Sequence, residues 1–165
     1  MKHSIIIILN VVLIIGTTSC QNISEEAAKH NNKIIDAHTD LVVQLDELKM
    51  KGAEEDVDRL RKEYNKTLEE ANKTLTFADT LTPFPNDDSF RVGLVNYSKG
   101  AIAALENEFD SILYYVAIPD TAYETKDSIA YFRLIETFDV KLLELQDSFV
   151  QVQATFAKKH EFSLE

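Results

Sequence analysis

The sequence predicts an all-α protein, an up-down-up-down four-helix bundle that follows an N-terminal signal peptide. The chain of 165 residues contains only four glycines and three prolines, so few residues interrupt helices. Apolar side chains recur at alternating spacings of three and four in four long segments, as on one face of an α-helix. The connections between these segments are short, which favours antiparallel neighbours packed as a bundle. The main alternative is an extended pair of helical hairpins that dimerises.

A short apolar leader precedes the first predicted helix. Lys2 and His3 are followed by the aliphatic residues 5–15, interrupted by Asn10, and by four small residues at 16–19. A transmembrane helix needs about 20 apolar residues, and this run is shorter. A basic head, an apolar run and small residues are typical of a cleaved signal peptide, which we expect at residues 1–19. A plain secretory signal and an uncleaved membrane anchor are the alternatives.

Residues 17–20 resemble the lipobox of bacterial lipoproteins, with Cys20, the only cysteine, at its end and Thr17 where such boxes usually carry Leu. The resemblance implies that Cys20 is lipidated on sulfur and becomes the first residue of the mature chain. Residues 20–23 would then form a lipidated tether to the membrane. Gln21 follows Cys20, which resembles the pattern of lipoproteins delivered to the outer membrane. The implied location is the cell envelope.

The first predicted helix begins at Ser24, a good N-cap, and two glutamates follow in its first turn. Its end is marked by Lys49 and Lys51, and Gly52 is suited to a left-handed cap. One apolar stripe consists of Ile34, His38, Leu41, Leu45 and Leu48.

The acidic residues 54–56 open a second predicted helix directly after this turn. So short a connection makes the first two helices antiparallel neighbours. The predicted stripe of the second helix consists of Val57, Leu60, Tyr64, Leu68, Ala71, Leu75 and Ala78.

Two prolines, Pro83 and Pro85, make residues 81–88 the clearest break after the leader. Asp87 or Asp88 is predicted to cap a third helix. Its stripe consists of Phe90, Leu94, Tyr97, Ala101, Leu105, Ile112 and Val116. Gly93 and Gly100 lie near one face of this helix. They mark a close approach of another helix or, alternatively, weaken the helix by about 1 kcal/mol each.

Pro119 and Asp120 end the third helix. The fourth helix is predicted to begin either at Thr121, which has capping-box spacing to Glu124, or at Thr125. Its stripe consists of Ile135, Phe138, Leu142, Leu145, Phe149, Val152 and Phe156. Residues 24–165 thus form one helical bundle domain.

Charge and composition exclude several classes of function. The net charge is −11, and the leader holds no acid, so the remainder of the chain is strongly acidic and unsuited to nucleic acid. No Glu-x-x-His, Cys-x-x-Cys-His, glycine-rich phosphate loop or Gly-x-Ser-x-Gly occurs. We therefore predict no catalytic residues, no metal and no cofactor. His38 lies on an apolar stripe, which leaves two interpretations open. It could be a metal ligand or a general base. A single histidine on such a stripe is more commonly a residue at the edge of the core that bonds to a neighbouring helix.

Tyrosines gather around the predicted loop at residues 117–125. Tyr114, Tyr115 and Tyr123 are the candidate partner-binding residues, because tyrosine combines a large contact area with a polar tip. They could instead cap the core of the bundle. If Cys20 marks the proximal end, this loop and Gly52 lie at the distal end.

Beyond the leader, the chain resembles a family of small helical bacterial surface lipoproteins without an assigned function. The resemblance rests on the paired amphipathic helices and the closing segment Phe-Ala-Lys-Lys-His-Glu-Phe at 156–162. It implies no catalytic residues. We predict a non-enzymatic envelope lipoprotein that presents its bundle to a protein or glycan partner. The alternative is a carrier that binds an apolar small molecule between the helices; a continuous apolar cavity would favour it, and a filled core with exposed tyrosines would favour partner binding.

Overall fold

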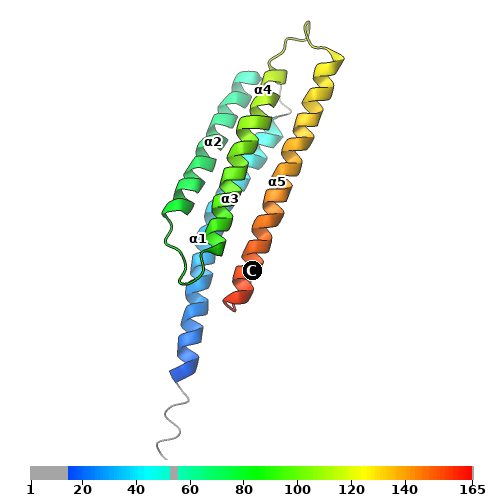
Figure 1. Ribbon diagram of the computed structural model, residues 1–165. Coiled ribbons are helices and arrows are strands. Elements are labelled where there is room, and N and C mark those ends of the chain that lie inside the picture. The colour runs from blue at the N-terminus through cyan, green and yellow to red at the C-terminus, as the bar shows by residue number, and fades with distance from the viewer. Residues whose placement is uncertain (1–14, 53–55, 165) are drawn as a thin grey trace, which may run out of the picture.

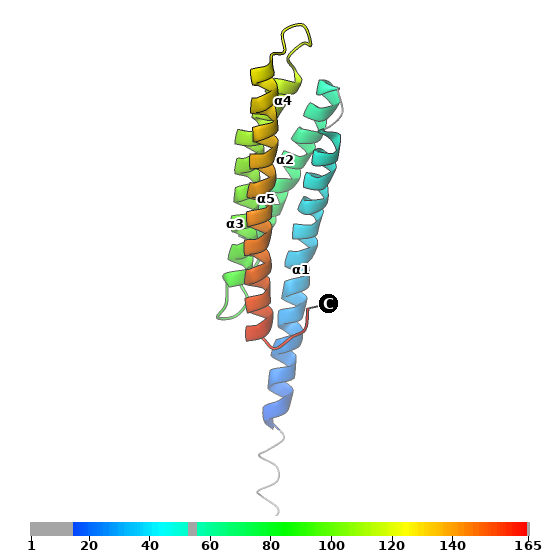
Figure 2. The ribbon, with the colours of Figure 1, turned by 90° about the vertical axis from the view of Figure 1, so that its right-hand side faces the viewer.

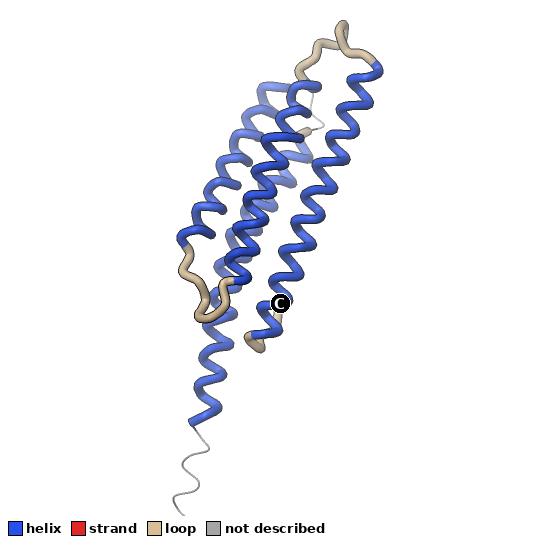
Figure 3. Tube along the Cα trace, viewed as in Figure 1, coloured by secondary structure: helices blue, strands red, loops and turns tan. Residues whose placement is uncertain are grey.

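The four-helix bundle predicted from the sequence is the architecture of the chain (Figure 1). The computed structural model describes residues 15–52 and 56–164, and their side chains from residue 23 onward. Every regular element in these residues is a helix (Figure 3). None of the described helices combines the length and apolar character needed to cross a membrane. Residues 1–14, most of the predicted signal peptide, lie outside the described residues.

Helix α1 spans Ile15–Lys51 and begins earlier than predicted. It includes residues 20–23, the predicted tether, in its first turns. The prediction that Ser24 is an N-cap is therefore wrong. Because the helix continues before Ser24, the Ser24 hydroxyl does not cap a helix end. It donates instead to the carbonyl of Glu161 at 3.0 Å.

The core-facing stripe and the end of α1 agree with the sequence. Every predicted stripe residue from Ile34 to Leu48 is buried. The helix ends at Lys51, and the Gly52 amide donates to the carbonyl of Leu48 at 2.9 Å. No described glycine has a positive φ, so the predicted left-handed conformation of Gly52 is wrong.

Helix α2 spans Val57–Thr80, and the Asp56 side chain caps it by accepting from the Arg59 amide at 3.1 Å. Two threonines, Thr67 and Thr74, take the buried positions predicted for Leu68 and Leu75, which are half-buried at the side. Their hydroxyls donate to α1 carbonyls, at 3.3 Å for Thr67 to Gln44 and 3.5 Å for Thr74 to Ala37. Because threonine is small and its hydroxyl finds a backbone carbonyl as a partner, α1 and α2 can pack closely at these positions.

The third helix of the bundle is continuous but changes its winding. It comprises α3 (Ser89–Ala104), the π-helical turn η1 (Leu105–Phe109) and α4 (Asp110–Val116). Of the two predicted caps, Asp88 holds the N-cap position, but its side chain makes no capping bond. The Asp87 side chain instead accepts from the Ser89 amide at 3.0 Å. A π turn adds a residue to the helical repeat. It brings Phe109, outside the predicted stripe, into the core.

Helix α5 spans Thr125–Lys159. Its N-cap is Glu124, which forms a capping box with Asp127. Of the two predicted starts, Thr125 is therefore confirmed and Thr121 is wrong. The predicted stripe faces inward, with Phe138, Leu142, Phe149 and Phe156 buried.

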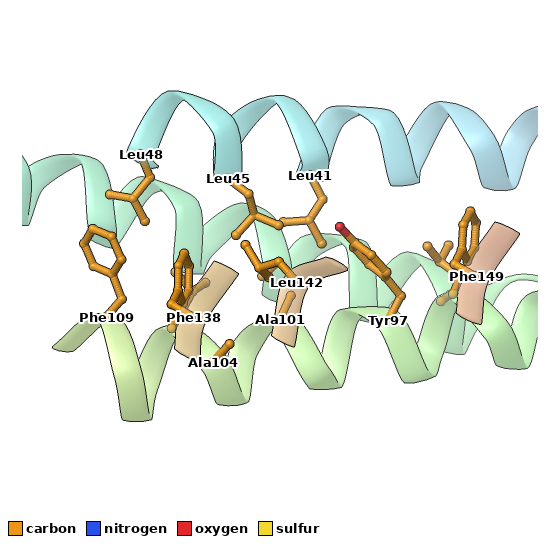
Figure 4. Close-up of a cluster of buried hydrophobic side chains, with 14 of the residues drawn as sticks. Leu41, Leu45, Leu48, Tyr97, Ala101, Ala104, Phe109, Phe138, Leu142 and Phe149 are labelled. Carbon is orange, nitrogen blue, oxygen red and sulfur yellow. The ribbon is translucent and has the colours of Figure 1, made fainter. Parts of the chain in front are cut away.

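Large side chains from α1, the third helix and α5 fill the interior (Figure 4). The backbones of α3 and α5 approach closely at Gly100, where a Cβ atom would overlap Leu145 Cδ2, and at Gly93, where a Cβ atom would lie 3.1 Å from Val152 Cγ1. The close approach predicted from these glycines is confirmed. Helices α1 and α5 approach each other closely at fewer places than the sequential neighbours do (Figure 2).

The ends of the bundle are ordered as predicted. Gly52 and the loop between α4 and α5 lie at one end, here called the distal end (Figure 1). The loop at residues 81–88 and the end of α5 lie at the other, the proximal end, beside the first third of α1.

Candidate functional site

The three candidate tyrosines lie at the distal end, in two groups. Tyr114 is 65% exposed and meets the half-buried Tyr115 edge to face, with ring centroids 5.3 Å apart. Tyr123 is an exposed residue of the loop before α5. Burial raises the pKa of Tyr131, and the charge of Tyr123 raises it further. The structure thus brings Tyr114 and Tyr115 together and places Tyr123 apart from them.

Tyr114 and Tyr115 line a shallow groove between α4 and α5, with a volume of about 500 Å³. Arg133 and Leu134 of α5 form its opposite wall. An aromatic pair facing an arginine and a leucine combines the residue types that dominate binding energy in protein interfaces.

A second groove, of about 280 Å³, lies on the other side of α5, toward α1. Its walls are mainly aromatic and include Phe109, Phe132 and Phe138. Contacts between α1 and α5 border it: the Tyr131 hydroxyl donates to the Gly52 carbonyl at 3.3 Å. Lys49 and Asp139 form an ion pair at 2.8 Å nearby.

A row of exposed apolar side chains stands on α5 between the two grooves and continues along the helix. We call it the α5 ridge; it consists of Ile129, Phe132, Val140, Leu143 and Val150. At 100° per residue these positions fall within ~80° of one another, on a face separate from the core stripe. Phe132 is 64% and Leu143 63% exposed. The exposed acids Glu136 and Asp147 lie on the same face between these residues. Exposed apolar residues gathered on one face with a polar rim are found at interaction sites in soluble domains.

The α5 ridge was not predicted from the sequence. Phe132, Val140 and Leu143 belong to no predicted stripe. A signal was present in the sequence, because α5 carries more large apolar residues than one face of a helix can hold.

His38 lies in the core between two other aromatic rings. It stacks on Phe149 of α5, with centroids 4.0 Å apart, and meets the edge of Tyr97 at 4.4 Å. Burial lowers the pKa of His38 to about 4, although hydrogen bonding with Gln146 acts in the opposite direction. Burial also raises the pKa of Tyr97 to about 12. The pair is therefore uncharged at neutral pH.

Metal-binding geometry is not found among the described residues, where no three His, Cys, Asp or Glu side chains are placed to hold an ion. The nearest approach to a catalytic arrangement is the trio of Asp87, Lys159 and His160. Asp87 accepts from Lys159 at 2.8 Å and lies 2.9 Å from His160 Nε2. These bonds join the loop at residues 81–88 to the end of α5.

Cys20, the predicted lipidation site, belongs to the first turns of α1, and its side chain lies outside those that the structure describes. The helix places it beyond the proximal end of the bundle (Figure 1). The distal grooves are therefore at the opposite end of the molecule.

No protein-family model, curated protein or solved structure matches this chain.

Proposed function

We propose that this chain is a non-enzymatic envelope lipoprotein, anchored through lipid on Cys20 in the outer membrane, that binds a protein partner at its distal end. The observation that carries the proposal is the exposure of Phe132 and Tyr114 beside two grooves that flank α5. The anchor at one end and the binding face at the other would hold the partner away from the membrane.

The chemistry of this face favours a protein over a glycan. The α5 ridge is aliphatic at four of its five positions, all except Phe132, and aliphatic side chains offer a glycan few hydrogen bonds. Interfaces between proteins have an apolar centre enriched in aromatic residues and arginine, with a polar rim. Tyr114 and Arg133, on opposite walls of one groove, fit that composition.

The filled core supports partner binding over the carrier alternative. Phe138, Phe149 and Phe90 are each nearly inaccessible and pack against other core side chains. Phe138 lies 5.3 Å from Phe109, and Phe90 lies 5.3 Å from Phe149, between ring centroids. A carrier would need a continuous space along these positions.

Crosslinking in intact cells tests the distal face. A photoreactive amino acid is placed at Phe132, and the crosslinked protein is identified. We expect one main partner, whose crosslink is lost when Tyr114→Ala and Leu143→Ala are combined, because truncating central anchors removes most of the binding energy.

The matched control is Val43→Ala combined with Val92→Ala, two exposed valines on α1 and α3 outside the distal face. This control should leave the crosslink unchanged. An identical crosslink in all three proteins, or none in the parent, would contradict the proposal.

The anchor is tested by metabolic labelling with an alkyne fatty acid. We expect label on the parent chain and none on Cys20→Ser, since the thiolate is the group that is alkylated. Equal labelling of both chains would show that Cys20 is not the lipidated residue.

A further inference from the structure

A third groove, larger than the two distal ones, opens at the proximal end. Its volume is about 760 Å³, and it lies between the first part of α1, the loop at residues 81–88 and the end of α5. Ile23, Leu81, Pro83 and Phe84 give it apolar walls. Sites for drug-sized ligands span about 300–1,000 Å³ and are mainly apolar with a few polar groups. This groove has that size and character.

The rim of this proximal groove is basic although the chain as a whole has a net charge of −11. Lys29, Lys33 and Lys159 line it, together with His30 and His160, against one carboxylate, that of Glu26. The chain has 17 lysines and arginines against 28 acids, so the excess of basic residues lining this groove is a local reversal of charge.

Most of these cations already have partners. Lys29 pairs with Glu25 at 2.9 Å, and Lys159 pairs with Asp87 at 2.8 Å. Lys33 forms no ion pair within the described part of the chain. It follows His30 by one helical turn, and the pKa of that histidine is lowered by burial and by the charge of Lys33 and raised by the charges of Asp88 and Asp87. Lys33 is therefore the lysine of the groove that is left without an ion pair among the described residues.

We propose that the proximal groove binds a single-chain anionic lipid. The acyl chain would lie along Ile23, Leu81 and Phe84, and the anionic headgroup would bond to Lys33. Three facts on these residues carry the proposal: an apolar wall, a volume suited to a small amphiphile, and one unpaired lysine at its edge. The proposal does not depend on a distal partner or on lipidation of Cys20.

Binding would change the environment of His30. The half-buried ring lies 5.6 Å from Phe84 and 6.0 Å from Phe156, between ring centroids, so it reports on the apolar wall. An acyl chain against the ring would bury it further, and a headgroup at Lys33 would place a negative charge near it. The NMR signals of the His30 ring should therefore shift when the groove is filled.

The test is a calorimetric titration of the protein purified from cells, with lysophosphatidylglycerol below its critical micelle concentration. Two further lipids are titrated for comparison. Oleate has a carboxylate headgroup, and lysophosphatidylcholine has a zwitterionic one. We expect saturable binding of at least one anionic lipid and weaker binding of lysophosphatidylcholine. The NMR signals of the His30 ring should shift on binding of that lipid.

Two substitutions and one control locate the site. Lys33→Gln should weaken binding about tenfold, the loss of one charge-assisted hydrogen bond. Ile23→Gln should weaken it through the apolar wall, and Ile23 is exposed, so the fold is retained. Lys62→Gln, an exposed lysine near the distal end of α2, should have no effect. Absence of binding, equal binding of lysophosphatidylcholine, or equal effects of Lys33→Gln and Lys62→Gln would overturn the proposal.

Discussion

His38 of α1 stacks on Phe149 of α5, with ring centroids 4.0 Å apart and ring planes inclined by 11°. The contact joins two helices whose backbones approach each other closely at few places. Among the described residues, His38 Nε2 is buried without a hydrogen-bond partner. A charged imidazolium there would be buried with only the Gln146 side chain to offset the loss of water, so the packing of α1 on α5 favours the neutral ring.

Stability should fall as the pH is lowered from 7 to 5. The pKa of His38 is about 4 in the folded chain and about 6.5 when unfolded. Between these values the unfolded chain binds more protons, so acid favours unfolding. His38→Phe keeps the stacked ring and removes the titration. The parent should lose about 2 kcal/mol more than this variant between pH 7 and 5, measured by urea unfolding.

The pH 7 measurement serves as the control, because His38 is neutral there in both states of the chain. A parent and a variant with the same pH dependence would contradict the assignment of a low pKa to His38.

The contact between Gly100 and Leu145 should show strong coupling. A methyl group at residue 100 overlaps the end of the Leu145 side chain, so Gly100→Ala alone forces Leu145 to move. In a Leu145→Ala background the same change meets open space and gains helix propensity, about 1 kcal/mol. The double-mutant cycle should therefore give an interaction energy above about 0.5 kcal/mol. If the two substitutions changed the free energy of unfolding additively, the contact between residue 100 and Leu145 would not limit how closely α3 and α5 pack.

Asp87→Asn should destabilise the proximal end. Burial alone would raise the pKa of Asp87, but hydrogen bonds from Lys159, Ser89 and His160 together hold it well below its usual range. The carboxylate therefore stabilises the fold above about pH 3.8, its unfolded pKa, and loses this effect as acid protonates the folded state. We expect a loss of about 1–3 kcal/mol at pH 7 and a smaller difference from the parent at pH 2, by thermal unfolding.

Asp120→Asn is the matched control, since Asp120 is an exposed residue of the loop before α5. Its unfolding temperature should equal that of the parent. An equal effect of the two substitutions would mean that the Asp87 contacts contribute nothing.

Two phenylalanines six residues apart on α5 should respond oppositely to truncation. Phe138 is 2% exposed in the core, and Phe132 belongs to the α5 ridge. Phe138→Ala should cost about 3–5 kcal/mol through lost burial and a cavity. Phe132→Ala should change the free energy of unfolding by less than about 0.5 kcal/mol. A large loss at Phe132 would mean that the ridge supports the fold instead of facing a partner.

The stripes of α1 and α5 could be predicted from the sequence because their largest apolar residues are also their most buried ones. Leu41 and Phe149 follow the helical period without a gap, and both lie in the core. The glycines of α3 were also informative, since residues without a side chain mark where another helix approaches.

The stripe of α2 was misplaced because its core positions are not its largest residues. Thr67 and Thr74 are buried since their hydroxyls bond to carbonyls of α1, a partner that only the packed bundle supplies. Phe109 lies outside the predicted stripe of the third helix because the π turn shifts the helical register at that point.

The sequence by itself determined the number of helices in the bundle, their order and the core faces of α1 and α5, because hydrophobic periodicity and breaking residues act locally along the chain. The tertiary structure decided where α1 begins, how His38 and the threonines are accommodated, and which apolar residues remain exposed. The physical reason is that these depend on groups distant in sequence. A side chain such as Phe132 is apolar in any context, but only the packing of the other helices leaves it facing water beside two grooves.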